Sequence, residues 1–143
     1  MRGLLGDLIS KDAQFTIADM EAGLEHLSRS DGTLRHIDML LVVLEPYRKA
    51  LETARRTLAL AGDLGIPKIY GVGSKIRDEV EAEEVKRFAG ELGLPLIGVI
   101  PYDDNVRLAD REGSAVIDLS PETEAVKAVE QLLDSLESAV VPA

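Results

Sequence analysis

Four short runs of largely apolar residues constrain what this 143-residue chain can fold into more than any other feature. Within each run, apolar residues stand at consecutive positions and do not alternate with polar ones. That pattern is typical of strands that helices cover on both faces, as in a parallel sheet. The runs are FTIA at 15–18, MLLVVLE at 39–45, KIYGVG at 68–73 and LIGVI at 96–100.

Helical patterns separate these runs. A first apolar face repeats at spacings of three and four, and Gly65 and Pro67 end it: Leu51, Ala54, Leu58, Ala61 and Leu64. A second face ends at Gly93 and Pro95: Val85, Phe88, Ala89 and Leu92. The last helix is predicted to start with Ser120 as N-cap and Pro121 in its first position, with this apolar face: Val126, Val129, Leu133, Leu136 and Val140.

A short helix over 4–9 and a short strand in AVIDL, 115–119, complete the predicted elements. Strands that alternate with helices predict right-handed crossovers and a three-layer α/β fold with a mostly parallel sheet. The length suits one domain, so we assign residues 1–143 to a single domain.

Charge and composition exclude several function classes. The net charge of -10 argues against nucleic acid or an anionic membrane as the main partner. No cysteine and only two histidines are present, so thiolate and His-rich metal sites are excluded. No apolar stretch approaches the ~20 residues of a membrane span, and the N-terminus lacks a signal-peptide pattern. We therefore expect a cytoplasmic protein.

Polar residues follow each apolar run, where parallel strands would bring them to one edge of the sheet. In such sheets, ligands bind at the C-terminal ends of the strands. The first three groups are Asp19, Glu21 and Gly23, then Glu45 and Pro46, then Gly73, Ser74, Lys75 and Asp78. The fourth group is Pro101, Tyr102, Asp103 and Asp104.

Four stretches of the sequence resemble the MinD/ParA group of P-loop ATPases, and most of all its CooC-like members. CooC-like proteins are accessory ATPases for nickel insertion into carbon monoxide dehydrogenase. The resemblance covers nearly the whole chain, in the family's order and spacing. The stretches are ADMEAGLEHLSR, DMLLVVLEPYRKALETARR, LGIPKIYGVGSKIRD and LIGVIPYDDNVRLADREG.

The resemblance implies a site for ATP and Mg²⁺. Asp19 matches the residue that ends the Walker B strand and helps hold magnesium, usually through water, and Gly23 matches the switch glycine that senses the γ-phosphate. Ser74 and Lys75 fall in the base-recognition motif, where the family usually has Asn before the Lys. The segment of Pro101, Tyr102 and Asp103 matches the loop over the other side of the base.

Simpler roles stand beside these assignments. Asp19 could be a helix N-cap or a turn residue, and Lys75 and Asp103 could be solvated loop residues. His26 is more simply a capping or packing residue than a metal ligand, because the chain offers it too few partners.

The family's phosphate loop, G-x-x-x-x-G-K-[ST], does not occur in the 143 residues, and neither does the Cys-x-Cys nickel motif of CooC-like proteins. We therefore interpret the chain as the C-terminal two-thirds of a P-loop ATPase, assign it no catalytic residue and predict no ATP hydrolysis by it alone. In this family a central strand lies between the strands matching 15–19 and 39–45. Without that strand, we expect either a rearranged sheet in which these two strands pair directly, or a homodimer in which a partner strand fills the gap.

Two other interpretations stay open. The chain could be a non-catalytic regulatory or interaction module that pairs with a full-length P-loop ATPase, with Glu25 and His26 as contacts. It could also be a small flavodoxin- or receiver-like domain that holds Mg²⁺ at its acidic strand tips. The receiver interpretation is disfavoured because the third run ends in Gly73, Ser74 and Lys75 and offers no phosphorylatable Asp.

Overall fold

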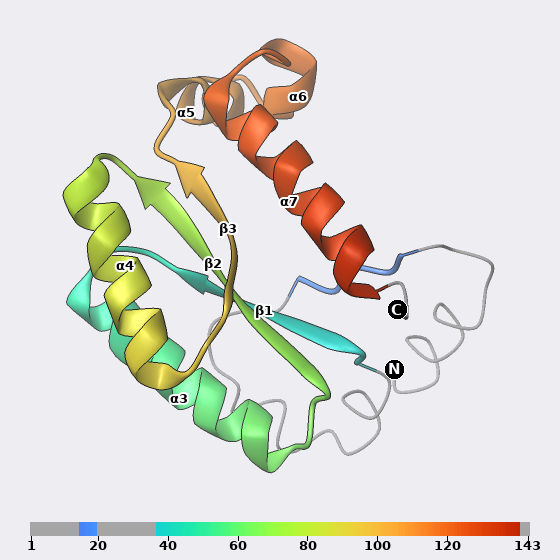
Figure 1. Ribbon diagram of the computed structural model, residues 1–143. Coiled ribbons are helices and arrows are strands. Elements are labelled where there is room, and N and C mark those ends of the chain that lie inside the picture. The colour runs from blue at the N-terminus through green and yellow to red at the C-terminus, as the bar shows by residue number, and fades with distance from the viewer. Residues whose placement is uncertain (1–14, 20–36, 141–143) are drawn as a thin grey trace.

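The computed structural model describes residues 15–19 and 37–140. In this part the chain forms a three-stranded parallel sheet of order β1-β2-β3 with helices on both faces (Figure 1). The strands are β1 (Met39–Leu44), β2 (Lys68–Ile76) and β3 (Leu96–Pro101). The helices are α3 (Arg48–Asp63), α4 (Glu79–Leu92), α5 (Asp104–Arg111), α6 (Val116–Leu119) and α7 (Glu124–Val140). The predicted α/β fold with a parallel sheet is confirmed.

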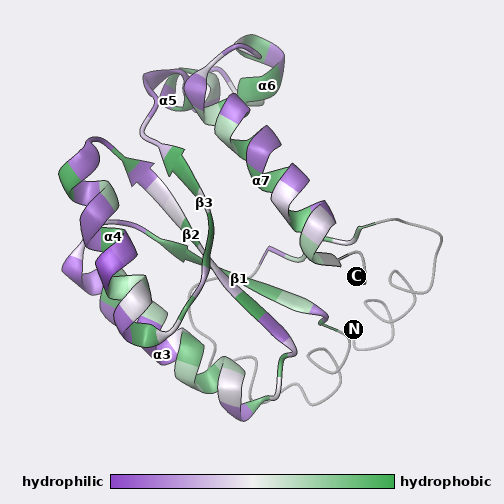
Figure 2. Cartoon of the chain, viewed as in Figure 1, coloured by the Kyte–Doolittle hydropathy of each residue, from purple (hydrophilic) through white to green (hydrophobic). Residues whose placement is uncertain are grey.

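The two faces of the sheet carry different helices. Helices α3 and α4 pack on one face, where Val42 and Leu44 of β1 join the core between sheet and helices. Val99 of β3 packs against that same core, whereas its neighbour Gly98 lies against Leu132 of α7. Adjacent residues of a strand face opposite ways, so α7 covers the other face at β3. Figure 2 shows strands with long apolar stretches, and helices that each carry both apolar and polar residues.

The core on the α3–α4 side is built from the faces that the helical spacing predicts. Leu51 and Ala54 of α3 and Val85 and Phe88 of α4 are buried there, and Leu44 is fully buried. Helix α4 begins at the N-cap Asp78, whose carboxylate accepts a hydrogen bond from the Glu81 N–H at 2.9 Å. Helix α4 ends at its C-cap Gly93, whose backbone is left-handed with φ of 67°.

Strand β2 contains an irregularity near its C-terminal end. Gly73 pairs with Val99 and Ile76 pairs with Pro101, so three steps along β2 oppose two steps along β3. The extra residue is a β-bulge, which bends a strand and changes the direction of its side chains. It falls at Ser74 and Lys75, two of the predicted site residues.

The strand predicted at 15–18 is absent from the sheet. Residues 15–19 form neither a strand nor a helix, and Ile17 is 89% exposed. Among the described residues, the sheet of order β1-β2-β3 offers them no neighbouring strand, and an apolar segment needs such a neighbour to be buried as a strand. The direct pairing of 15–19 with β1, one of the two expected ways to close the gap, is not seen in the described residues.

The C-terminal part also differs from the sequence prediction. The predicted strand AVIDL is the short helix α6, and Ser120 is its C-cap, not the N-cap of α7. Helix α7 starts only at Glu124, because Thr123 supplies its cap: the Thr123 hydroxyl accepts a hydrogen bond from the Val126 N–H at 3.3 Å.

The apolar face predicted for α7 is confirmed only in part. Val126 is buried as predicted, but Leu132 is buried where Leu133 was expected. Val129 and Leu133 are about half exposed because they lie off the side that packs on β3. In the part of the chain that the structure describes, no helix is long and apolar enough to cross a membrane. The predicted helix over 4–9 lies outside the described residues.

Candidate functional site

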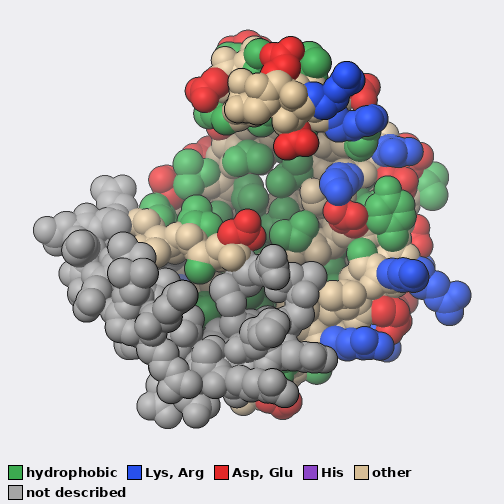
Figure 3. Space-filling view, turned by 180° about the vertical axis from the view of Figure 1, so that it is seen from behind, with side chains coloured by type: hydrophobic (Ala, Val, Ile, Leu, Met, Phe, Trp, Pro, Cys, Tyr) green, Lys and Arg blue, Asp and Glu red, His purple; other side chains and the backbone are tan. Residues whose placement is uncertain are grey.

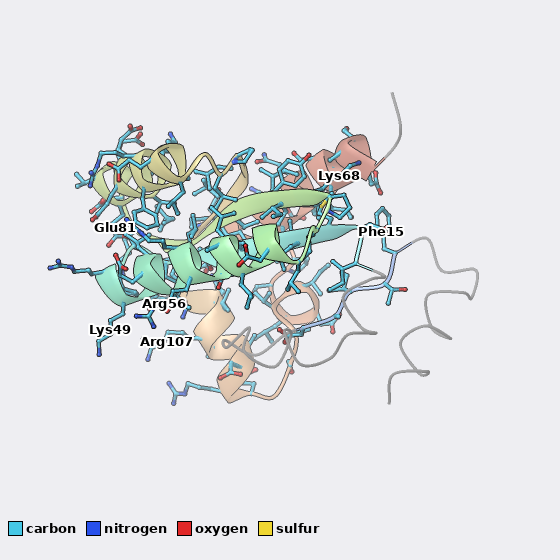
Figure 4. The ribbon with its side chains drawn as sticks, turned by 90° about the horizontal axis from the view of Figure 1, so that it is seen from below. Phe15, Lys49, Arg56, Lys68, Glu81 and Arg107 are labelled. Carbon is cyan, nitrogen blue, oxygen red and sulfur yellow. The ribbon has the colours of Figure 1, made fainter. Side chains whose placement is uncertain are left out.

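The C-terminal ends of the three strands meet at one edge of the sheet because all three run parallel. Figure 4 shows Glu81 and Arg107 at this edge, with Lys68 and Phe15 at the opposite end. The edge brings together five of the predicted residues, from the tips of β2 and β3: Ser74, Lys75, Pro101, Tyr102 and Asp103.

Lys75 combines an unusual backbone with an ion pair. Its backbone φ is 57°, in the left-handed region that residues other than Gly rarely adopt. Its ammonium Nζ lies 2.8 Å from Glu45 Oε1 at the tip of β1. The hydrogen bond and charge of Glu45 raise the pKa of Lys75 above its ordinary value. The strained bulge therefore directs Lys75 across the edge toward β1, an arrangement that is concentrated at functional sites.

Asp103 holds the start of two helices at once. Its Oδ1 accepts hydrogen bonds from the backbone N–H and the side-chain amide of Asn105, at 2.9 and 3.0 Å, at the start of α5. Its Oδ2 accepts a hydrogen bond from the Ala125 N–H at 3.2 Å, at the start of α7. These donors, first the Asn105 N–H, hold the pKa of Asp103 below its ordinary value. The half-buried Asp103 side chain is therefore hydrogen-bonded within the protein, and its part in a base site stays a prediction.

Tyr102 is fixed by contacts from both neighbouring elements. The guanidinium of Arg77 lies over its ring, 4.7 Å from the ring centroid. Its hydroxyl is 3.2 Å from Asp104 Oδ1 and accepts a hydrogen bond from Arg107 Nη1 at 3.4 Å. Tyr102 also lines an open groove of about 610 Å³ between the tip of β3 and the start of α7. The groove is lined by Tyr102, Asp103, Asp104, Asn105, Ser120, Pro121, Glu122, Thr123 and Glu124.

The predicted phosphate side of the site is only partly described. Asp19 ends the segment 15–19 and is exposed, and Gly23 lies outside the described residues, as do Glu21, Glu25 and His26. Within 15–19 and 37–140, no group of three His, Cys, Asp or Glu side chains could hold a metal ion. The described carboxylates therefore fit Mg²⁺ only as partners of a hydrated ion, not as a complete ligand set.

Sequence reasoning missed three residues of this edge. Arg77 covers Tyr102, Asn105 binds Asp103, and Thr123 caps α7. Thr123 left a signal in the sequence, since Thr directly before Glu and Ala at a helix start is a common N-cap pattern. The stacking of Arg77 on Tyr102 left none, because it depends on how two neighbouring strands are aligned.

Several known proteins are similar in sequence to this chain. No family model matches the chain. An uncharacterised ATP-binding protein of Methanocaldococcus jannaschii is 36% identical over 132 residues, which are 91% of this chain and 51% of that protein. The carbon monoxide dehydrogenase accessory protein CooC of Rhodospirillum rubrum is 36% identical over 121 residues, 85% of this chain and 44% of CooC. The chain spans about half the length of the curated relatives it matches.

Solved structures share the fold. The cell division ATPase MinD of Pyrococcus furiosus matches 97% of this chain with a TM-score of 0.77 and 21% identity, over 59% of the MinD chain. MinD of Pyrococcus horikoshii, solved with Mg-ADP, matches 96% of this chain with a TM-score of 0.76 and 18% identity, over 56% of its length. At this level of identity the structural matches show the fold alone.

The fold is therefore that of the MinD/ParA class of P-loop ATPases. Over about half of their length, CooC and the ATP-binding protein of Methanocaldococcus jannaschii are similar in sequence to this chain, which makes the chain their relative. The resemblance expected from the four sequence stretches is confirmed.

Proposed function

We propose that this chain forms the base side of a CooC-like ATP site and does not hydrolyse ATP by itself. The observation that carries the proposal is the C-terminal edge of the sheet, where Ser74, Lys75 and Tyr102 lie at the ends of neighbouring parallel strands. Ligands of such sheets bind at this edge. The ATP-binding relatives and the Mg-ADP complex of a MinD protein support a nucleotide as the ligand.

The proposed inactivity follows from the chemistry of phosphoryl transfer. That reaction depends on backbone N–H groups and a lysine that neutralise the β- and γ-phosphates. No G-x-x-x-x-G-K-[ST] stretch occurs in the 143 residues, and Lys75 is held by Glu45. Asp19 could orient a hydrated magnesium ion that bound phosphates supply, which is the role we propose for it. We therefore propose weak nucleotide binding without turnover.

Phosphate release from Mg-ATP and isothermal titration calorimetry test this proposal on the purified chain. We expect phosphate release at the level of a buffer blank, and a calorimetric titration with ATP that shows no tight binding. A known P-loop ATPase in the same assay serves as the positive control. Turnover above the blank, or tight ATP binding, would refute the proposed inactivity.

A second candidate function is an interaction module that completes or regulates another P-loop ATPase. The observation that favours it is β1, which has no strand partner on its outer edge among the described residues. Val43, on the face of β1 away from α3 and α4, is 59% exposed, although buried parallel strands normally have both faces covered. Apolar side chains also gather on the rear surface below α5 and α6 (Figure 3).

The partner for this surface would be a second copy of the chain or a full-length P-loop ATPase. Size-exclusion chromatography with light scattering separates these outcomes. A mass of two chains supports the second copy, and co-elution with an added CooC-like ATPase supports the module. If the chain has the mass of a monomer and does not co-elute with the added ATPase, the second candidate is excluded. We also propose that the chain acts in the cytoplasm, as its composition suggests.

A further inference from the structure

Tyr102 is held from three directions, more firmly than an exposed loop residue needs. Its backbone N–H donates to the Ile76 carbonyl at 2.9 Å, which continues the pairing of β3 with β2. Its hydroxyl meets Asp104 and Arg107 of α5. The Arg77 guanidinium covers one face of its ring. These contacts together fix the plane of an aromatic ring at the rim of the groove.

Arg77 owes its own position to the start of α4. Its backbone N–H donates to Glu81 Oε2 at 2.7 Å, while the Glu81 N–H donates to the Asp78 carboxylate at 2.9 Å. Asp78 thus caps the first turn of α4, and the Glu81 side chain binds the backbone N–H of the residue before the cap. The backbone of Arg77 is thus locked between the end of β2 and the start of α4. From this fixed backbone its side chain reaches the ring of Tyr102, where the guanidinium lies 4.7 Å from the ring centroid.

We propose that Arg77 is a positioning residue of the nucleobase site and that it fixes the ring of Tyr102 as a stacking surface for the base. The inference rests on the proposed function, because it takes the base to lie at this edge. A planar base gains most from a ring whose orientation is already set, because less conformational freedom is lost on binding. Arg107 contacts only the hydroxyl of Tyr102, so the ring orientation depends on it less than on Arg77.

Adenosine is the probe, since it carries the base without phosphates that the acidic chain would repel. The affinity is measured by NMR, from the shifts of Tyr102 in the full 143-residue chain. We expect Arg77→Ala to weaken adenosine binding roughly two- to fivefold, the scale of one cation–π contact. Arg77→Lys should recover part of this loss, because a cation remains without the planar stack. The matched control is Arg87→Ala on the exposed side of α4, which removes the same charge and an ion pair with Glu91.

Two readouts separate positioning from general destabilisation. The ring carbon shifts of Tyr102 should move in the free Arg77→Ala protein and stay in place in Arg87→Ala. Tyr102→Phe, which keeps the ring and loses the hydroxyl contacts, should bind adenosine within about twofold of the unchanged chain. Unfolding midpoints of all variants show whether each one is folded.

The outcomes are distinguishable. Weaker binding in Arg77→Ala alone, with shifted Tyr102 ring signals, supports the inference. Equal binding by Arg77→Ala and the unchanged chain overturns it and leaves the proposed function standing. A saturating adenosine titration with no shift at Tyr102 in the unchanged chain overturns both.

Discussion

Removal of the Asp103 carboxylate should loosen two helices at once. One oxygen caps α5 through the Asn105 N–H and the other caps α7 through the Ala125 N–H, at 2.9 and 3.2 Å. Loss of one helix cap costs about 1 kcal/mol, so Asp103→Ala should lower the free energy of unfolding by about 2 kcal/mol. For a chain of this size, that corresponds to a fall of about 7 °C in the midpoint of thermal unfolding.

Asp103→Asn should lower the free energy of unfolding by about half as much as Asp103→Ala. The Asn side chain has one acceptor oxygen, and its NH₂ group cannot accept the second backbone hydrogen bond. Urea unfolding followed by circular dichroism at pH 7 measures both variants. The controls are Asp134→Ala and Asp134→Asn, which remove an exposed carboxylate from the middle of α7 and should change stability by less than about 0.5 kcal/mol.

The pH dependence carries a definite sign. The folded-state pKa of Asp103 is lowered, chiefly by the Asn105 N–H. The stabilisation by the carboxylate is therefore complete above the ordinary Asp pKa of about 3.9 and is lost as the pH falls through the lower folded-state pKa. The stability gap between the unchanged chain and Asp103→Ala should stay constant from about pH 7 to 5 and narrow below about pH 4. If Asp103→Ala is as stable as Asp134→Ala at pH 7, the double-cap reasoning is refuted.

Further predictions concern the bulge and the core, all measured by urea unfolding. Lys75→Gly should be more stable than Lys75→Ala by about 1 kcal/mol, because both lose the Glu45 ion pair and only Gly relieves the positive φ; equal stabilities would argue against strain at Lys75. Gly71→Ala should lower the free energy of unfolding by roughly 1–3 kcal/mol, because the new Cβ would lie 2.9 Å from Leu96 Cδ2. Gly62→Ala in α3 has open space around the new Cβ and should raise the free energy of unfolding by about 0.5–1 kcal/mol. Leu44→Ala should cost about 2–5 kcal/mol because Leu44 is fully buried; a cost below about 1 kcal/mol would contradict its place in the core.

The sequence predicted the helices and strands for which the apolar periodicity and the terminating Gly or Pro residues indicate the same element. The runs at 39–45, 68–73 and 96–100 became β1, β2 and β3, and the apolar spacing of α3 and α4 matched their buried faces. Each of these strands finds a parallel neighbour within the chain. The run at 15–18 is also largely apolar but has no strand neighbour among the residues that the structure describes, so its local pattern could not decide its structure.

The candidate edge was predictable in position and not in detail. Parallel strands bring Lys75 and Tyr102 to one edge, as the order of the elements implies. The bulge that turns Lys75 toward Glu45, and the stack of Arg77 on Tyr102, depend on strand register, which no local pattern specifies. The start of α7 was misplaced because Pro121 after Ser120 imitates a helix start, whereas Thr123 is the residue that caps the helix.

The most direct test of the central claim is an NMR titration of the isotopically labelled chain with adenosine and, separately, with Mg-ATP. If the chain is the base side of a nucleotide site, both ligands should shift the amides of Ser74, Lys75 and Tyr102 at the edge of the sheet. Both should bind weakly, in the millimolar range, since the phosphates gain no cradle here. Shifts confined to other parts of the chain, or ATP binding far tighter than adenosine binding, would contradict the account.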